Sequence, residues 1–165
     1  MSISRRSFVG LAAVAVAVPA ARALSGARQG AGAEHFEVAL SEAQWRVKLS
    51  PAAFRVLRQE DTELAFTSPL NDEHRRGTFA CAGCALPLFA STTKFDSGTG
   101  WPSFYAPLTN AVRTRDDGSL GIVRTEVHCH RCGGHLGHVF NDGPKPTGLR
   151  YCMNGAAMTF AVARV

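Results

Sequence analysis

Apolar residues at helical spacing mark two short helices in residues 41–58. Ser41-Glu42-Ala43-Gln44 is typical of a helix start, with the serine as the cap and the glutamine at the reciprocal position of a capping box. Trp45 and Leu49, with Val47 as a further candidate, give this helix a short apolar face. Ser50-Pro51 predicts the start of a second helix, because proline is common at the first helical position after a serine cap.

From Thr78 onward the pattern changes to short apolar runs that alternate with Gly, Pro and Asp. Asp117-Gly118 separates two such runs and predicts a hairpin, while the alternation in residues 159–165 predicts a C-terminal strand. Residues 62–70 predict a loop or extended segment that ends at Pro69. We therefore expect a mainly β fold, in which an antiparallel domain follows small N-terminal helices.

Near the N-terminus, residues 8–18 form an apolar run that is too short for a membrane span of about 20 residues. Basic residues precede this run and a small-x-small end at residues 21–23 follows it, as in an export signal. We predict a signal peptide over residues 1–23, a flexible linker over residues 24–35 and the folded domain over residues 36–165. Signal cleavage would leave no stable membrane insertion; an uncleaved anchoring segment is the alternative.

The residues before that run, Ser4-Arg5-Arg6-Ser7-Phe8-Val9, resemble the twin-arginine export signal of bacteria. The resemblance implies a periplasmic or exported protein that folds in the cytosol before export. A metal ion would then be bound before the chain meets an oxidising compartment.

The 165 residues suffice for one domain, and 45% hydrophobic with 19% charged residues excludes global disorder. The net charge of +5 arises partly in the signal segment, which holds three of the 18 basic residues and no acidic residue. Fifteen basic residues then face 13 acidic ones. A net charge of +2 gives little support to a nucleic-acid partner, and we predict none.

Two C-x-x-C pairs, Cys81 with Cys84 and Cys129 with Cys132, predict one structural zinc ion. Each C-x-x-C turn delivers two thiolates, and two such turns complete a tetrahedral shell with no open position for chemistry. Two disulfides are the alternative that an exported location allows. A redox role for one pair is a weaker alternative, because neither pair sits in a βαβ pattern.

The fifth cysteine, Cys152, lies in a predicted strand. Alternation would bring Arg150, Cys152 and Asn154 to one face and leave Tyr151 and Met153 for packing. A nearby cation would stabilise a thiolate and raise its reactivity. The alternative is a buried, inert cysteine.

Two further segments add candidate chemistry. His135 and His138 lie three residues apart in a glycine-rich segment, and either can move a proton near neutral pH. Residues 94–105 place aromatic side chains, Trp101 and Phe104 among them, in a loop rich in Gly and Pro. This loop is either the rim of a binding site or a small satellite core.

Together these segments resemble the B-type methionine sulfoxide reductases, from about Glu42 to Phe160. The matching motifs are SGTGWPSF, both C-x-x-C pairs, GGHLGHVFNDGP and LRYCMN, in that family's order. The resemblance implies a pair of antiparallel sheets in a tent-like arrangement, with small N-terminal helices. It also implies reduction of the R epimer of methionine sulfoxide in oxidised proteins.

By the same resemblance, Cys152 is the nucleophile and forms a sulfenic acid. The other expected catalytic residues are His135, His138, Asn154 and Arg150. Trp101 and Phe104 are the expected substrate-binding residues. The remaining four cysteines correspond to the zinc ligands of the family.

Some members of that family carry a resolving cysteine at the position of Thr99. With four thiols assigned to zinc, this chain has none to spare, so we expect an external thioredoxin-like thiol to regenerate Cys152. Two other classes of function compete with the enzyme. A zinc-held binding module without catalysis would turn over no sulfoxide, and an exported metal or redox sensor would lose zinc reversibly on mild oxidation.

Overall fold

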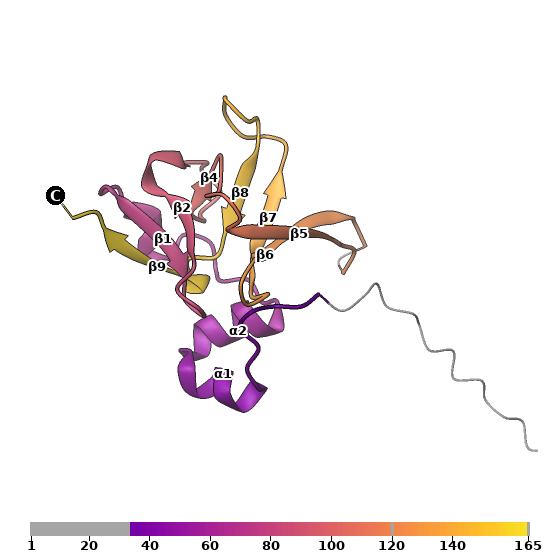
Figure 1. Cartoon of the computed structure of the whole chain (residues 1–165). Helices are drawn as coiled ribbons and strands as arrows, with labels where there is room; N and C mark the ends of the chain where they lie inside the picture. Colours follow the sequence, from indigo (N-terminus) through magenta and orange to yellow (C-terminus); the bar gives the residue numbers. More distant parts are fainter. Residues whose placement is uncertain (1–33, 120, 165) are drawn as a thin grey trace, which may run out of the picture. The chain divides into compact units, whose positions relative to one another are not determined.

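A computed structural model of the chain describes residues 34–119 and 121–164 (Figure 1). The predicted signal peptide and residues 24–33 of the predicted linker lie outside the described residues. Of the two described residues of that linker, Glu34 lies with Oε1 3.4 Å from Arg113 Nη1 and with Oε2 3.2 Å from His128 Nε2. Within the described part of the chain, no helix is long and apolar enough to cross a membrane.

The two helices begin where the caps predict. Helix α1 (Glu42–Lys48) starts at Ser41 with both hydrogen bonds of the capping box, and α2 (Pro51–Gln59) starts at Ser50. Trp45 and Leu49 are buried as expected, whereas the side chain of Val47 is 90% exposed. Val47 therefore does not belong to the apolar face. The segment after α2 is a loop that leads into a short 3-10 turn, η1 (Pro69–Asp72).

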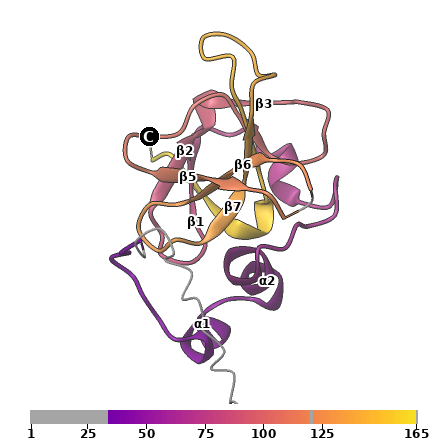
Figure 2. The same cartoon turned by 90° about the vertical axis from the view of Figure 1, so that its right-hand side faces the viewer.

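In the described residues, nine strands form two sheets in which every neighbouring pair is antiparallel, which confirms the predicted fold class. The smaller sheet has the order β2 (Pro87–Ala90), β1 (Gly77–Cys81) and β9 (Met158–Val162). The larger has the order β3 (Lys94–Phe95), β4 (Ser103–Phe104), β8 (Arg150–Met153), β7 (His135–Phe140), β6 (Arg124–Cys129) and β5 (Val112–Asp117). Figures 1 and 2 show both helices at one end of these sheets.

Aromatic rings join the two sheets. Phe104 of β4 stacks on Phe89 of β2 with ring centroids 4.3 Å apart, and it meets the edge of Phe79 of β1 at 4.9 Å. None of the three rings is accessible to solvent. Phe104 is thus a core residue and not a residue of the substrate site, which corrects our prediction. Both interpretations of the aromatic loop hold in part, since Phe104 belongs to the core and Trp101 lines the cavity that also contains Cys152.

The β5–β6 hairpin forms as predicted but with a longer connection. The last paired residues are Asp117 and Arg124, so residues 118–123 make the turn, of which Leu120 lies outside the described residues. Asp117 is therefore the final residue of a strand and not the first residue of a tight turn. The C-terminal strand β9 ends its pairing at Val162, before the predicted end at residue 165.

Candidate active site and metal centre

The register of the larger sheet aligns four polar residues across four neighbouring strands. Glu126 lies opposite His138, His138 opposite Cys152, and Cys152 opposite Ser103. Directly opposed residues of antiparallel strands project to the same face, with their Cβ atoms about 4.5–5.5 Å apart. The sheet therefore brings the predicted nucleophile next to a histidine that can accept or donate a proton.

A cavity of about 130 Å³ opens at this point of the sheet. Cys152, His138, Asn154 and Trp101, all predicted site residues, line it together. The other lining residues are Thr62, Arg124, Gly137 and Phe140. His135, Arg150 and Phe104 were also predicted for the site but do not line this cavity.

Cys152 is partly buried, and burial raises the pKa of its thiol above the ordinary value. Hydrogen bonding by Thr99 and the charge of Arg150 oppose this effect without reversing it. Arg150 is itself held by Asp142, with Nε and Nη2 donating to the carboxylate at 2.8 Å each. Arg150, the predicted cation, thus lies two residues from Cys152 on the same strand. Its charge does not outweigh burial, so the resting Cys152 side chain is a thiol. Asn154 lies one residue beyond the end of β8 and not on its face.

His138 and Asp117 form the pair that faces the thiol. His138 Nε2 donates to Asp117 Oδ2 at 2.7 Å, because hydrogen bonds from Ser119, His138 and Arg124 hold the pKa of Asp117 well below its usual range. Burial lowers the pKa of His138, and the hydrogen bond to Asp117 only partly compensates. The resting imidazole is therefore neutral, with Nδ1 left to accept a proton.

His135 lies beside this pair and faces a second, polar cavity of about 350 Å³ that His138 also lines. The two imidazole centroids are 5.4 Å apart. His135 Nδ1 bonds to the buried Glu126 Oε1 at 2.7 Å, and Arg115 Nε donates to the other oxygen of that carboxylate. Burial raises the pKa of Glu126, but the bonds from His135 and Arg115 outweigh burial and leave it lowered. His135 is thus fixed by a buried carboxylate and does not contact the thiol cavity.

The loop before η1 holds in place two of the residues that line the thiol cavity, Trp101 and Asn154. Trp101 Nε1 donates to the backbone oxygen of Glu63 at 3.1 Å, and the backbone N–H of Glu63 donates to Asn154 Oδ1 at 3.0 Å. Asn154 Nδ2 donates to the backbone oxygen of Leu136 at 3.2 Å. The carboxylate of Glu63 accepts from the backbone N–H groups of Gly155 and Ala156. Both ends of the Asn154 amide are therefore used to hold the chain around Cys152.

Sequence reasoning missed Asp117, Glu126 and Glu63. Asp117 was interpreted as a turn residue because glycine follows it, and Glu126 belongs to none of the motifs that the sequence shows. Glu63 lies in a segment without any recognisable motif. No local pattern marks Glu126, because its strand also carries Arg124, Thr125 and His128.

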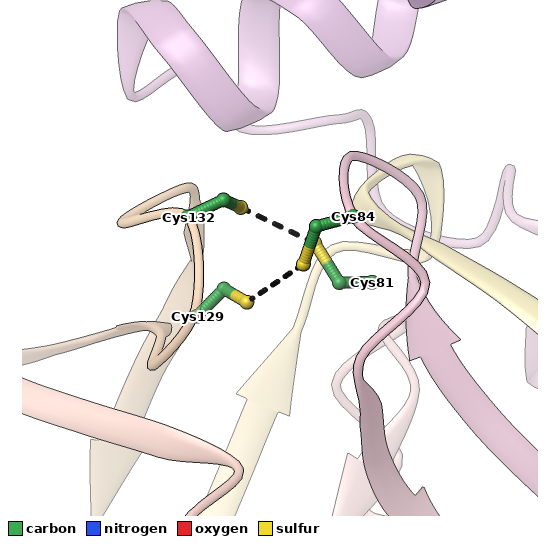
Figure 3. A group of neighbouring side chains, drawn as sticks. All are labelled: Cys81, Cys84, Cys129 and Cys132. Carbon is green, nitrogen blue, oxygen red and sulfur yellow. Dashed lines mark hydrogen bonds between the residues drawn. The ribbon is translucent and has the colours of Figure 1, made fainter. Parts of the chain in front are cut away.

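The four paired cysteines meet between the two sheets. Figure 3 shows their sulfur atoms pointing toward one another, two from the end of β1 and the turn after it and two from the end of β6 and the turn after it. The sulfur atoms are 3.7 Å apart for Cys81 and Cys132 and 3.5 Å apart for Cys84 and Cys129, and all four lie within 4.8 Å of one another. All five cysteines of the chain lie in the described residues, and none forms a disulfide.

This donor set fits a zinc ion. Four ligands at 2.3 Å from a tetrahedral centre would lie about 3.8 Å apart, close to the separations found here. Burial of three of the four thiols keeps water from the centre. A shell completed by four thiolates leaves no open position, so a metal bound here would hold the two loops together and take no part in chemistry.

The chain is similar to known proteins over most of its length. Residues 49–162 match the SelR domain. A peptide methionine sulfoxide reductase MsrB of Thiobacillus denitrificans is 58% identical over 121 residues, which cover 73% of this chain and 92% of the relative. A protein of the same name from Leptospira interrogans is 52% identical over 127 residues, covering 76% and 97%. Another from Leifsonia xyli is 52% identical over 132 residues, covering 79% and 95%.

Proposed function

The chain belongs to the SelR domain family of MsrB-type peptide methionine sulfoxide reductases, and we propose that it reduces the R epimer of methionine sulfoxide in proteins to methionine. It is accordingly an oxidoreductase. The observation that carries the proposal is the cavity in which Cys152 lies opposite His138, with Asn154 and Trp101 in the same wall.

The reaction begins with the thiol proton of Cys152. Because His138 Nε2 already donates to Asp117, its Nδ1 takes this proton and leaves a thiolate beside an imidazolium. The thiolate attacks the sulfoxide sulfur while His138 returns the proton to the oxygen, whose developing charge is the main barrier. The hydroxyl group then passes from the substrate sulfur to Cys152 Sγ, so that the sulfur–oxygen bond of the substrate and the new sulfur–sulfur bond both break. Methionine leaves, reduced by two electrons, and Cys152 becomes a sulfenic acid, oxidised by two. The proton that His138 gives to the oxygen is the one it took from Cys152, so this step needs no proton from the solvent.

Trp101 accounts for recognition of the substrate methyl group. A methyl group offers no hydrogen bond, but sulfur and methyl pack well on the face of an indole. The bond from Trp101 Nε1 to Glu63 fixes the plane of that indole. A methyl held at Trp101, an oxygen held at His138 and a lone pair directed elsewhere would select one epimer.

A second thiol from another molecule then regenerates Cys152. The Thr99 hydroxyl lies 3.8 Å from Cys152 Sγ, at the position of the resolving cysteine of some family members. The other four thiols are gathered in one cluster. A thioredoxin-like donor is therefore the proposed reductant, and zinc is the proposed occupant of the four-cysteine site.

The reaction is tested with each separated epimer of a blocked methionine sulfoxide, dithiothreitol as reductant and Cys152→Ser as the control. We expect reduction of the R epimer alone, with none in the variant. If a folded protein with intact metal content reduces neither epimer, the enzyme is excluded and a zinc-held binding module becomes the better explanation.

The substrates we propose are oxidised proteins outside the cytosol, because residues 1–23 have the pattern of a twin-arginine signal. Fusing residues 1–35 to a reporter that is active only in the periplasm tests this. Replacing both Arg5 and Arg6 with lysine should abolish the signal from the reporter. Equal reporter activity with and without the arginine pair would exclude this export route.

A further inference from the structure

Three hydroxyl groups form a continuous chain beside Cys152. Ser103 Oγ lies 3.1 Å from the backbone oxygen of Trp101 and 2.7 Å from Ser97 Oγ. Ser97 Oγ lies 2.8 Å from Thr99 Oγ1, which in turn lies 3.8 Å from Cys152 Sγ. The chain therefore links the thiol to a fixed backbone acceptor through three side chains.

The direction of these hydrogen bonds follows from counting protons. Each hydroxyl has a single hydrogen, and that of the fully buried Ser103 is committed to the backbone oxygen of Trp101. Ser97 can then donate its hydrogen to Ser103 Oγ. This contact, at 2.7 Å, is shorter than the contact of 2.8 Å that Ser97 makes with the Thr99 hydroxyl. The hydrogen of Thr99 is the one that can turn, either toward Ser97 or toward Cys152.

Two arrangements of the chain match the two protonation states of Cys152. When Cys152 is a thiol, its S–H donates to Thr99 and every hydroxyl donates onward toward Trp101. When Cys152 is a thiolate, Thr99 turns its hydrogen toward the sulfur and the bond from Ser97 to Ser103 stays in place. Ionisation of the thiol therefore requires the rotation of one hydroxyl only.

We propose that Thr99 is the hydrogen-bond donor that stabilises the Cys152 thiolate, and that Ser97 and Ser103 are positioning residues that aim it. This inference deepens the proposed function and rests on Cys152 being its nucleophile. Donation to a charged acceptor is stronger than donation to a neutral one, so Thr99 favours the thiolate over the thiol. The position that holds a resolving cysteine in some family members thus holds, in this chain, a hydrogen-bond donor to the thiolate.

Other titratable groups lie around this sulfur. Arg150 on the same strand opposes the effect of burial, His138 and Arg124 line the same cavity, and Asp96 and Glu63 lie on the neighbouring loops. None of them is altered by removing a hydroxyl from the chain. The contributions of Thr99 and Ser103 both oppose the effect of burial on the thiol.

The test is the pH dependence of Cys152 alkylation by iodoacetamide in the full chain, followed by peptide mass spectrometry so that the four clustered thiols do not interfere. Thr99→Val keeps the shape of the side chain but removes the hydroxyl. We expect the pH midpoint to rise by about half a unit to one unit, which corresponds to the difference between a hydrogen bond to a charged group and one to a neutral group. Thr99→Ser keeps the hydroxyl and should keep the wild-type midpoint.

Ser103→Ala interrupts the chain behind Thr99 and should raise the midpoint by a smaller amount. It also serves as the second variant if Thr99→Val fails to fold. An unchanged midpoint in both variants would overturn the inference. Alkylation needs no sulfoxide, so a raised midpoint in a protein that reduces neither epimer would refute the proposed function alone.

Discussion

At the scale of single residues, the pair of Asp117 and His138 determines how activity should depend on pH. The proposed reaction needs one proton shared between His138 and Cys152. At pH values below the lowered pKa of His138, the imidazole is already protonated and cannot act as the base. At pH values above the raised pKa of Cys152, the thiol has lost the proton that His138 must pass to the oxygen. The pH profile of kcat/KM should therefore be bell-shaped, with limbs below about 6.5 and above about 8.5, the ordinary values of the two groups.

Replacing Asp117 with asparagine tests this pair. The carboxylate raises the pKa of His138, so its loss should move the acid limb to lower pH. The asparagine also no longer fixes the tautomer of His138, and we expect kcat/KM to fall about a hundredfold or more. The measurement is kcat/KM for the R sulfoxide across pH, with Asp116→Asn, an exposed neighbour, as the control. An acid limb that does not move would contradict the role of Asp117.

Single residues could be predicted where a motif or unusual chemistry marks them. Cys152 stands out as the one thiol outside the C-x-x-C pairs, and Trp101 stands out in a loop rich in glycine. Asp117 and Glu126 could not be predicted, because only the strand register brings their carboxylates to the histidines. Phe104 was misassigned, since neighbouring residues of a strand face opposite sides and only one side of this loop reaches the cavity.

At the scale of elements, the four-cysteine cluster joins the end of β1 in one sheet, with the turn that follows it, to the end of β6 in the other (Figure 3). Strands β6 and β7 carry Glu126 and His138. A metal bound to the cluster would therefore fix the strands that position the site, although it lies outside the cavity itself.

Cys84→Ser removes one ligand from this cluster. Because structural zinc sites contribute folding free energy directly, we expect loss of bound metal and a fall in Tm of about 10 °C or more. Metal content and thermal unfolding are the measurements, and Cys152→Ser is the control because its thiol lies outside the cluster. Full metal content at an unchanged Tm would exclude Cys84 as a ligand.

Gly137 lets strand β7 pass close to β8. Its φ of 154° is unfavourable for other residues, and a Cβ atom there would clash with the backbone oxygen of Cys152. Gly137→Ala should therefore lower the free energy of unfolding by about 3 kcal/mol or more. Urea unfolding measures the change. Gly118→Ala, with no atom within 4 Å of the added methyl, should change it by less than about 0.5 kcal/mol.

Elements with local start signals could be predicted, and pairings between distant strands could not. Ser41 and Ser50 mark both helices because capping involves only residues within one turn. The hairpin after Asp117 was found, but its turn is longer than two residues because pairing already ends at Asp117 and Arg124. The order of strands in the larger sheet depends on long-range contacts that no local pattern encodes.

At the scale of the whole molecule, the number of thiols decides how the catalytic cycle closes. Four of the five cysteines form one cluster, and the fifth lies in the cavity with a threonine hydroxyl as its neighbour. An oxidised Cys152 therefore has no thiol partner inside the chain. The protein should need a second molecule to resolve its sulfenic acid, and one substitution should move that step into the chain, with an external reductant then needed only to reduce the resulting disulfide.

Thr99→Cys supplies the missing partner. The native hydroxyl lies 3.8 Å from Cys152 Sγ, so a sulfur at that position needs only a small shift to reach the length of a disulfide bond. After one turnover without reductant, we expect wild-type Cys152 to remain a sulfenic acid that dimedone traps. The variant should instead carry a disulfide between Cys152 and the introduced thiol. Intact-mass and peptide spectrometry distinguish the two, and an internal disulfide in the wild-type chain would refute the need for an external thiol.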